Sequence, residues 1–242
     1  MRILIIADIH ANLTALEAVL THAQGTFDMV WCLGDLVGYG PEPNACVQRI
    51  RALDKLVCLS GNHDRAAIGK MDLNTFNPVA ATALRWTQMA LLSESRDYLN
   101  KLPSMQVING TMIAHGSPRQ PYFEYISDTA LARKMFGHFT GAICLIGHTH
   151  IACVFQQSGN RCHKLIAPTG KSFSINAGRY ILNPGAVGQP RDQNPQAAYA
   201  ILDLSTDSWV QQRVPYNITE TQRRMRRYEL PETLITRLDL GV

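Results

Sequence analysis

The sequence lacks the features that mark membrane proteins and disulfide-rich secreted proteins. Its first apolar run, Ile3 to Ala7, is far shorter than a membrane span or the apolar part of a secretion signal. None of the six cysteines forms a C-x-x-C pair, and the first four lie in apolar or helix-like surroundings. Reduced packing residues are therefore expected, rather than a disulfide framework or a zinc knot. We expect a cytoplasmic protein that makes no membrane contact.

The chain also lacks a strong excess of one charge, because 23 Lys and Arg residues face 19 Asp and Glu residues. This balance suits a small anionic ligand and does not demand nucleic acid. One basic cluster could meet nucleic acid, although a solvated helix face explains it better; it comprises Arg223, Arg224, Arg226 and Arg227. With 242 residues, 46% of them hydrophobic, the chain can bury one sizeable core. A single domain over residues 1–242 is therefore expected.

Apolar patterning in the first half predicts an α/β fold. Short continuous runs at 3–7, 29–33 and 56–59 are typical of buried strands, and helical spacing separates them. The resulting β-α-β-α-β order predicts a parallel sheet with helices on its faces. Residues 66–102 contain no strand-like run and predict a helical, lid-like excursion, whose tip around residues 74–77 could select a substrate.

The second half predicts a hairpin and more strands. An Asn-Gly turn at 109–110 lies between two apolar arms, which favours a hairpin. A helix is expected over 129–139, and two short C-terminal helices broken at Pro231. A buried strand is expected at 143–146. Later runs predict a second, mainly antiparallel sheet, and they cover 151–156, 162–167, 180–183, 198–204 and 208–214.

Residue types that commonly bind metals directly follow the predicted strands of the first 150 residues. In α/β sheets, ligands bind beyond the carboxyl ends of the strands. Those ends read, in chain order, D-x-H at 8–10, GD at 34–35, GNHD at 61–64, HG at 115–116 and GHTH at 147–150. Five of the eight histidines lie in these motifs. Side chains at i and i+2 of an extended segment share one side, so Asp8 with His10, and His148 with His150, can aim at one place.

The donor types indicate which metals are expected. Carboxylates, imidazoles and an amide, without a thiolate, suit a catalytic site better than a structural zinc site. We expect two divalent ions, with manganese first and iron, zinc, nickel or cobalt as alternatives. Two neighbouring ions need a shared carboxylate, and Asp35 is the natural bridge.

This motif set resembles that of the calcineurin-like metallophosphoesterases, specifically their small bacterial phosphodiesterase branch, over residues 1–205. The resemblance implies a four-layer αββα sandwich. It implies that Asp8, His10 and His150 bind one metal, that Asn62, His115 and His148 bind the other, and that Asp35 bridges them. His63 matches the family histidine that contacts the phosphoryl group and protonates the leaving oxygen, with Asp64 placed to orient it.

The activity that the resemblance implies is hydrolysis of phosphodiesters or small phosphomonoesters, by in-line attack of a hydroxide held between the metals. The expected partner is a small phosphate ester. Neither nucleic acid nor a membrane is expected as a partner, and a homo-oligomer stays open. The alternatives are a dinucleoside polyphosphate hydrolase, a nuclease of the same superfamily, or a non-catalytic scaffold, which would show decayed ligands.

Position 39 differs in residue type from the corresponding position of related phosphatases. Serine/threonine phosphatases and symmetric dinucleoside tetraphosphate hydrolases carry a phosphate-gripping arginine where this chain has Tyr39. The lost charge could be replaced by Arg65, Arg119 or Arg191. Asn12 could reach the substrate or cap the first helix. Asn12, Tyr39, Arg119 and Arg191 are therefore the candidate substrate residues.

Overall fold

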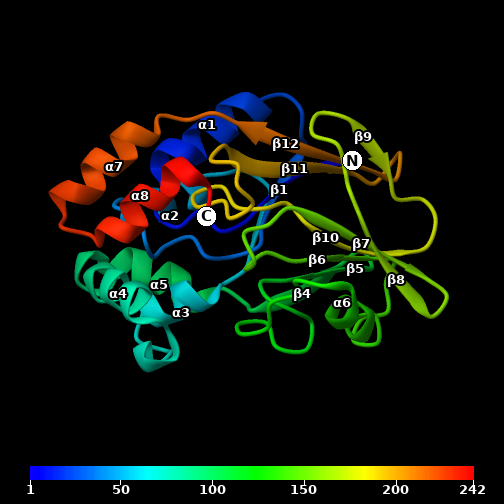
Figure 1. Cartoon of the computed structure of the whole chain (residues 1–242), viewed down its shortest axis with the longest axis horizontal. Coiled ribbons are helices and arrows are strands. Elements are labelled where there is room, and N and C mark those ends of the chain that lie inside the picture. The colour runs from blue at the N-terminus through cyan, green and yellow to red at the C-terminus, as the bar shows by residue number, and fades with distance from the viewer.

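Two six-stranded sheets pack against each other in the computed structural model, which describes residues 1–242 (Figure 1). The first sheet has the order β3-β2-β1-β11-β12-β9 and the second β4-β5-β6-β10-β7-β8. The strands of the first are β1 (Arg2–Ile6), β2 (Met29–Cys32), β3 (Leu56–Cys58), β9 (Ser172–Ser174), β11 (Ala197–Asp203) and β12 (Ser208–Val214). Those of the second are β4 (Met105–Ile108), β5 (Thr111–Ala114), β6 (Ile143–Leu145), β7 (Cys153–Ser158), β8 (Arg161–Leu165) and β10 (Arg179–Asn183).

Helices cover the outer faces of both sheets, which gives the predicted helix-sheet-sheet-helix layers. The helices are α1 (Leu13–Ala23), α2 (Pro43–Arg51), α3 (Asn62–Ala67), α4 (Pro78–Ala90), α5 (Ser93–Lys101), α6 (Thr129–Met135), α7 (Ile218–Arg227) and α8 (Glu232–Leu240), with a 3-10 turn, η1 (Leu73–Thr75). Residues of α1, α2, α3, α4 and α5 share the core cluster on the outer face of the first sheet, and α6 packs on the second sheet (Figure 1). α7 and α8 pack against α4, on the left of Figure 1. No helix combines the length and apolar character needed to cross a membrane.

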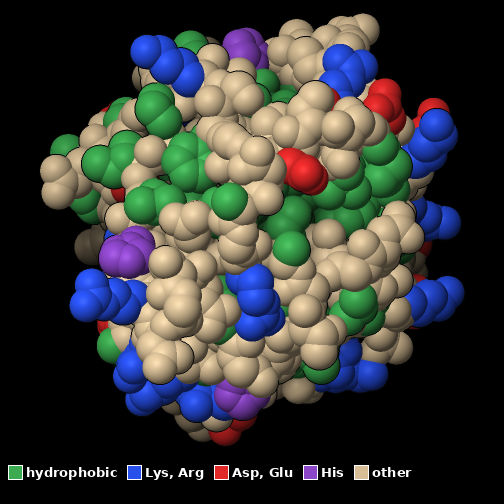
Figure 2. Space-filling view, turned by 90° about the vertical axis from the view of Figure 1, so that its right-hand side faces the viewer, with side chains coloured by type: hydrophobic (Ala, Val, Ile, Leu, Met, Phe, Trp, Pro, Cys, Tyr) green, Lys and Arg blue, Asp and Glu red, His purple; other side chains and the backbone are tan.

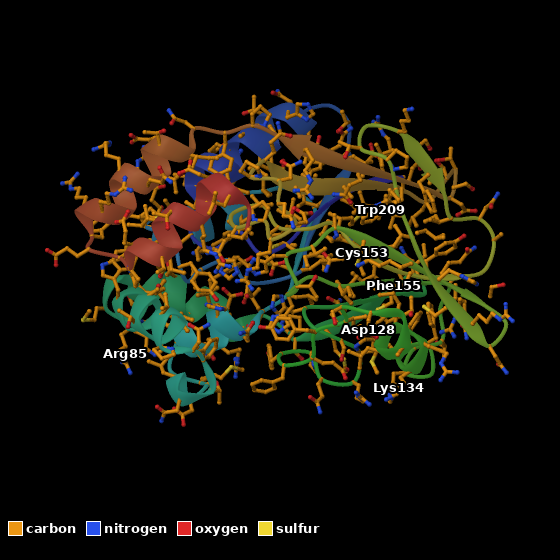
Figure 3. All side chains as sticks on the ribbon, in the orientation of Figure 1. Arg85, Asp128, Lys134, Cys153, Phe155 and Trp209 are labelled. Atoms are coloured by element: carbon orange, nitrogen blue, oxygen red, sulfur yellow. The ribbon has the colours of Figure 1, made fainter.

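The core lies on both faces of each central strand. Along β1, Ile3 and Ile5 point between the sheets, whereas Leu4 and Ile6 point toward the helices. A strand buried on both faces requires a continuous apolar run, which is why this segment shows no alternation. Trp209, labelled in Figure 3, is fully buried in the cluster between the sheets.

The structure confirms the parallel and hairpin predictions. Strands β1, β2 and β3 pair in parallel. Strands β4 and β5 form the hairpin, and its turn residues Asn109 and Gly110 have φ of 48° and 79°. Both values are in the left-handed region that a two-residue hairpin of this type requires.

The predicted composition of the second sheet is wrong. β11 pairs antiparallel with β1, and β12 extends the same sheet, so neither joins β7, β8 and β10. Those three strands instead extend the sheet that begins with the β4–β5 hairpin and β6. The chain returns to the first sheet after a long excursion, and order along the sequence does not encode that return. The 129–139 helix is also shorter than predicted, because α6 ends at Met135.

Replacing Trp209 by alanine should lower the free energy of unfolding by about 3–5 kcal/mol, because the change empties a fully buried site between the sheets. Trp209→Phe should lower the free energy of unfolding by clearly less, because it leaves a smaller cavity. Urea unfolding followed by circular dichroism measures both. Equal, small losses below about 1 kcal/mol would contradict this placement of the core.

Candidate metal centre

The carboxyl ends of strands from both sheets meet at one site. After β1, the backbone N–H of Asp8 donates to the oxygen of Gly34 at 3.0 Å, and that of His10 to the oxygen of Asp35 at 3.0 Å. After β6, the N–H of His148 contacts both carboxylate oxygens of Asp8 at 3.1 Å. This last contact joins the two sheets at the point where the predicted donors emerge.

Two groups of buried donors share one carboxylate. The first group is Asp8, His10, Asp35 and His150, the second is Asp35, His115 and His148, and donor atoms within each group lie within 4.8 Å of one another. Asp35 Oδ2 lies 3.5 Å from His10 Nε2 and 3.3 Å from His115 Nε2. The amide oxygen of Asn62 lies 3.2 Å from His115 Nε2. The seven predicted ligands are therefore brought together, with Asp35 between the two groups.

Backbone carbonyls orient three of the imidazoles. The Nδ1 contacts run from His10 to the oxygen of Val37 (3.1 Å), from His115 to that of Leu33 (2.9 Å) and from His150 to that of Gln189 (2.7 Å). A carbonyl can only accept, so each Nδ1 carries the proton. In the neutral form of each ring, Nε2 is therefore left with a lone pair aimed at the centre, as metal-binding histidines require.

Five of the seven candidate ligands have a left-handed backbone. They are Asp8, His10, Asp35, His148 and His150, with φ between 48° and 65°. Such conformations cost about 1–3 kcal/mol each and persist where the surroundings impose them. The extended i, i+2 geometry predicted for the two donor pairs is therefore wrong, although each pair does converge. Left-handed turns after the strands aim the side chains.

The donor set fits divalent ions, because two of its buried atoms lack a hydrogen-bond partner. Asp35 Oδ2 and His148 Nε2 are buried and make no hydrogen bond with the protein. A buried polar atom left unpaired costs about 1–3 kcal/mol. Both atoms point into the shared group, where bound cations would satisfy them.

His63 lies beside the centre without joining it. Its ring packs against those of Tyr39 (4.4 Å between centroids), His10 (4.8 Å) and Phe76 (5.0 Å). The backbone N–H of His63 donates to Asp35 Oδ1 at 2.9 Å. Burial lowers the pKa of His63 to about 4, so the imidazole of the free protein is neutral near pH 7. A bound anionic phosphoryl group would raise that pKa and favour the protonated form.

Asp64 makes its hydrogen bonds to the backbone and none to the ring of His63. One carboxylate oxygen accepts the N–H of Gly61 at 2.9 Å, and the other accepts that of Val37 at 3.1 Å. The Nδ1 of His63 is buried and has no hydrogen-bond partner. Asp64 therefore fixes the two loops around the site and does not orient the imidazole directly.

Burial and neighbouring opposite charges shift the pKa values of the candidate ligands in the absence of metal. Burial raises the pKa of Asp8 to about 7. Burial disfavours the charged form of His115, but Asp35 and Asp8 outweigh it and raise the pKa of His115 to about 9. The same pairing holds the pKa of Asp35 below its usual range in spite of burial. The Asp35–His115 pair therefore holds a proton near neutral pH.

The four candidate substrate residues occupy different environments. Asn12 caps α1 through Ala15 N–H, accepts from Thr221 and donates to the oxygen of Gly188, so its polar atoms are used within the protein. The guanidinium of Arg119 pairs with Glu124. These contacts give Asn12 the capping role rather than contact with substrate, and they leave Arg119 neutralised.

Arg191 is the arginine that the structure places next to the centre. Its guanidinium lies 5.8 Å from the ring of Tyr39, and its Nη2 lies 3.4 Å from the Tyr39 hydroxyl. Gln189 holds it from the other side at 2.8 Å. Burial is the main cause that lowers the pKa of His63 and of His150, and the positive charge of Arg191 lowers both further.

Three aromatic residues near the centre were not predicted. Tyr122, Phe123 and Tyr125 follow His115 on the loop after β5, and the ring of Tyr125 stacks on His148 with centroids 3.8 Å apart. The sequence feature that could have indicated them is a group of three aromatic residues within four positions, shortly after the HG motif.

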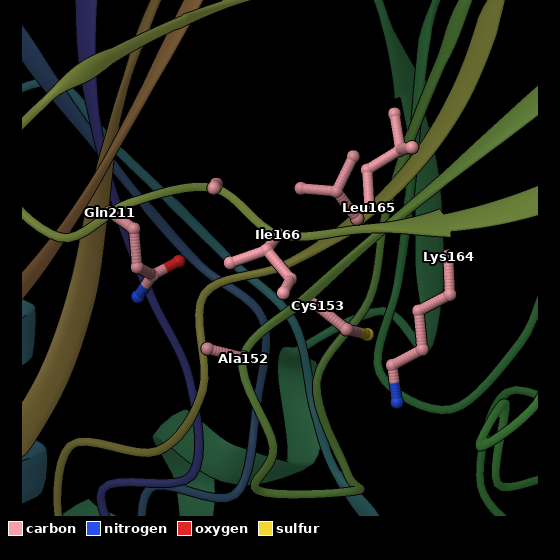
Figure 4. Close-up of a pocket in the computed structure, with 8 residues that line it drawn as sticks. Ala152, Cys153, Lys164, Leu165, Ile166 and Gln211 are labelled. Carbon is pink, nitrogen blue, oxygen red and sulfur yellow. The ribbon is translucent and has the colours of Figure 1, made fainter.

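A cavity of about 380 Å³ lies away from the candidate ligands. It lies between β7, β8 and β12, and six of its eight lining residues are apolar (Figure 4). Ile166, one of the lining residues labelled in Figure 4, is 88% exposed. Figure 2 shows apolar side chains gathered on one end of the molecule. None of the candidate ligands lines this cavity.

Comparison with known proteins identifies the family. The profile of the calcineurin-like phosphoesterase superfamily domain matches residues 1–207. The chain belongs to this superfamily. As a calcineurin-like phosphoesterase, it is placed among phosphoester hydrolases, and its Asp and His clusters agree with divalent-metal binding.

Three relatives match the whole calcineurin-like chain. A metallophosphoesterase from Sphaerobacter thermophilus, with a crystal structure, is 45% identical, with coverage of 100% of this chain and 99% of that one and a TM-score of 0.92. An uncharacterised protein of Methanocaldococcus jannaschii is 36% identical over 99% of this chain and 98% of its own length. A hypothetical protein from Pyrococcus horikoshii shares the fold, with 20% identity, coverage of 100% and 98%, and a TM-score of 0.83.

Affinity for Mn²⁺ should rise with pH. The ion requires neutral His115 and ionised carboxylates, so binding must displace the proton that holds the pKa of His115 near 9. Displacing the proton of His115 alone makes the affinity rise about tenfold per pH unit below that pKa, or about a hundredfold from pH 6 to pH 8. Asp8, whose pKa is about 7, must also lose its proton, so the rise over this range should be at least that large. Calorimetry in buffers of different ionisation enthalpy measures affinity and proton release together. A constant affinity without proton release would contradict this charge assignment.

Proposed function

We propose that the protein is a two-metal phosphoesterase that hydrolyses phosphodiesters or small phosphomonoesters. The observation that carries the proposal is the shared carboxylate: Asp35 belongs to both donor groups, and its Oδ2 is buried without a hydrogen bond. A single-metal site would not need donors on both sides of this atom. Manganese as the metal and a cytoplasmic location stay predictions.

Asp8, His10 and His150 would hold one ion and Asn62, His115 and His148 the other, with Asp35 between them. When bound, two such ions make a water acidic enough to attack near neutral pH and neutralise the phosphoryl oxygens.

The other residues would bind the phosphoryl group and move a proton. His63 lies beside the centre, from which it could donate a proton to the leaving oxygen. Arg191 supplies a cation, held by Gln189 and Tyr39, in place of the arginine that Tyr39 replaces. The hydroxyl of Tyr39 contacts that guanidinium, so the substitution at position 39 and the placement of Arg191 belong together.

Two alternative functions find less support. A non-catalytic scaffold would tolerate loss of donors, whereas all seven positions retain a donor and His63 is in place. A nuclease needs free cations along the nucleic-acid backbone. Three arginines of the basic cluster on α7 instead form ion pairs: Arg223 and Arg224 with Glu220, and Arg226 with Glu232.

Metal-stripped protein resupplied with Mn²⁺ should hydrolyse a generic aryl phosphodiester or its monoester. Asp35→Asn should abolish measurable turnover, because it removes the shared negative charge, and His63→Ala should lower kcat by about 10²–10⁴-fold. The exposed Asp54→Asn is the matched control. Full activity of a folded Asp35→Asn protein, or no turnover with Mn, Fe, Ni, Co or Zn, would contradict the proposal.

Gly38→Ala should lower kcat while leaving metal content unchanged. A Cβ at Gly38 would lie 2.5 Å from His63 Nδ1, so the imidazole must move, and displacing a catalytic group by about 1 Å can cost about a hundredfold. Gly69→Ala is the matched control, since Gly69 also has positive φ (76°, against 89°) but nothing within 4 Å. Equal kinetics in the two variants would argue against a role for His63.

A further inference from the structure

A cleft with aromatic walls opens directly beside His63 and His148. It has a volume of about 190 Å³, and Tyr39 lines it beside His63. Its other aromatic rings are those of Phe76, Tyr122, Phe123 and Tyr125. These four rings come from two separate segments. Phe76 follows η1 in the 66–102 excursion, and the other three lie on the loop after β5. Any group that projects from a phosphoryl centre at His63 toward this side enters the cleft.

The inner end of the cleft contacts the candidate centre. The ring of Phe76 meets His63 edge-on, with centroids 5.0 Å apart, and Tyr125 stacks on His148 at 3.8 Å with 27° between the planes. Because His63 is the candidate proton donor to the leaving oxygen, the alcohol that leaves is the part of the substrate facing this cleft.

The loop after β5 is fixed by its own hydrogen bonds. Gly116 N–H donates to the oxygen of Pro121 at 2.7 Å, and the hydroxyl of Ser117 donates to Glu124 at 2.6 Å. The same hydroxyl accepts the N–H of Gln120 at 2.9 Å. A loop closed in this way holds its aromatic side chains in place before a ligand arrives, which reduces the ordering cost of binding.

Two rings of the cleft are partly exposed to solvent. Phe123 is 54% exposed and Tyr125 is 49% exposed. Neither shares a hydrophobic core cluster with the sheets. Exposed aromatic rings on a conformationally fixed loop beside an active centre are typical of stacking platforms for planar groups.

The residues that line the cleft favour a neutral planar ligand. No Lys, Arg, Asp or Glu lines the cleft. Additional phosphates would therefore find no cation there, which disfavours a polyphosphate chain on this side. The amide oxygen of Asn77 caps α4, whereas its nitrogen and the hydroxyl of Tyr122 make no hydrogen bond with the protein. These uncharged groups can pair with the heteroatoms on the edge of a base.

We propose that this cleft binds a nucleobase, so that the substrates are esters of a single phosphate with a nucleoside as the leaving alcohol. The inference rests on the proposed phosphoesterase function and adds the substrate class. The base stacks on Phe123 and Tyr125, and the 66–102 excursion closes the opposite wall with Phe76 and Asn77.

The test compares substrates that differ only in the base. Adenosine 5′-phosphate and its methyl diester are set against ribose 5-phosphate and its methyl diester, with manganese-loaded protein. Stacking of one base on an aromatic ring should raise kcat/KM about tenfold over the base-free ester. Phe123→Leu should abolish most of this preference and Phe123→Tyr should keep it. Tyr228→Leu, at a ring that is 45% exposed and outside the cleft, should not change the preference.

A second measurement is independent of turnover. Calorimetry with adenosine and metal-free protein should detect binding that Phe123→Leu weakens about tenfold.

Three results would overturn the inference. One is equal turnover of nucleoside and base-free esters together with no binding of adenosine; this outcome leaves the phosphoesterase proposal intact. A preference that Phe123→Leu does not alter would also overturn it, as would a clear preference for diadenosine polyphosphates over the single-phosphate esters. No turnover of any ester with any metal would instead refute the phosphoesterase function itself.

Discussion

The interaction on which this structure depends is the crowding of carboxylates and imidazoles around Asp35, at the seam between the two sheets. Burying such groups is unfavourable unless opposite charge compensates them. In the metal-free protein, the opposite charges of Asp35 and His115, which lie 3.3 Å apart without a hydrogen bond, supply part of that compensation. The remaining unsatisfied atoms, Asp35 Oδ2 and His148 Nε2, lie where cations would satisfy them.

The fold supports this crowding in two ways. Parallel strands bring their carboxyl ends to one edge, and left-handed turns after those strands aim the side chains inward. Backbone carbonyls then fix the imidazoles, so that His10, His115 and His150 present Nε2 to the centre. The substrate-facing groups sit outside this rigid set, on loops, and those loops can differ between relatives while the centre stays the same.

Motifs and most strands were predictable from the sequence because they depend on local patterning, whereas the four layers followed from the resemblance to the family. The apolar run of β1 is continuous because both of its faces are buried, and each donor motif directly follows a strand. The pairing of β11 with β1 was not predictable, since long-range register leaves no local trace. The contacts of Asp64 and the choice of Arg191 over Arg119 depend on tertiary geometry, and so does the position of the ring of Tyr125 against His148.

The most direct test of the two-metal centre is anomalous X-ray scattering from crystals soaked in Mn²⁺. Two separate peaks should appear, one bounded by Asp8, His10 and His150 and the other by Asn62, His115 and His148, with the Asp35 carboxylate contacting both. In crystals of Asp35→Asn, at least one peak should lose occupancy. A single peak that Asp35 does not touch, or no peak at saturating manganese, would contradict the shared-carboxylate centre.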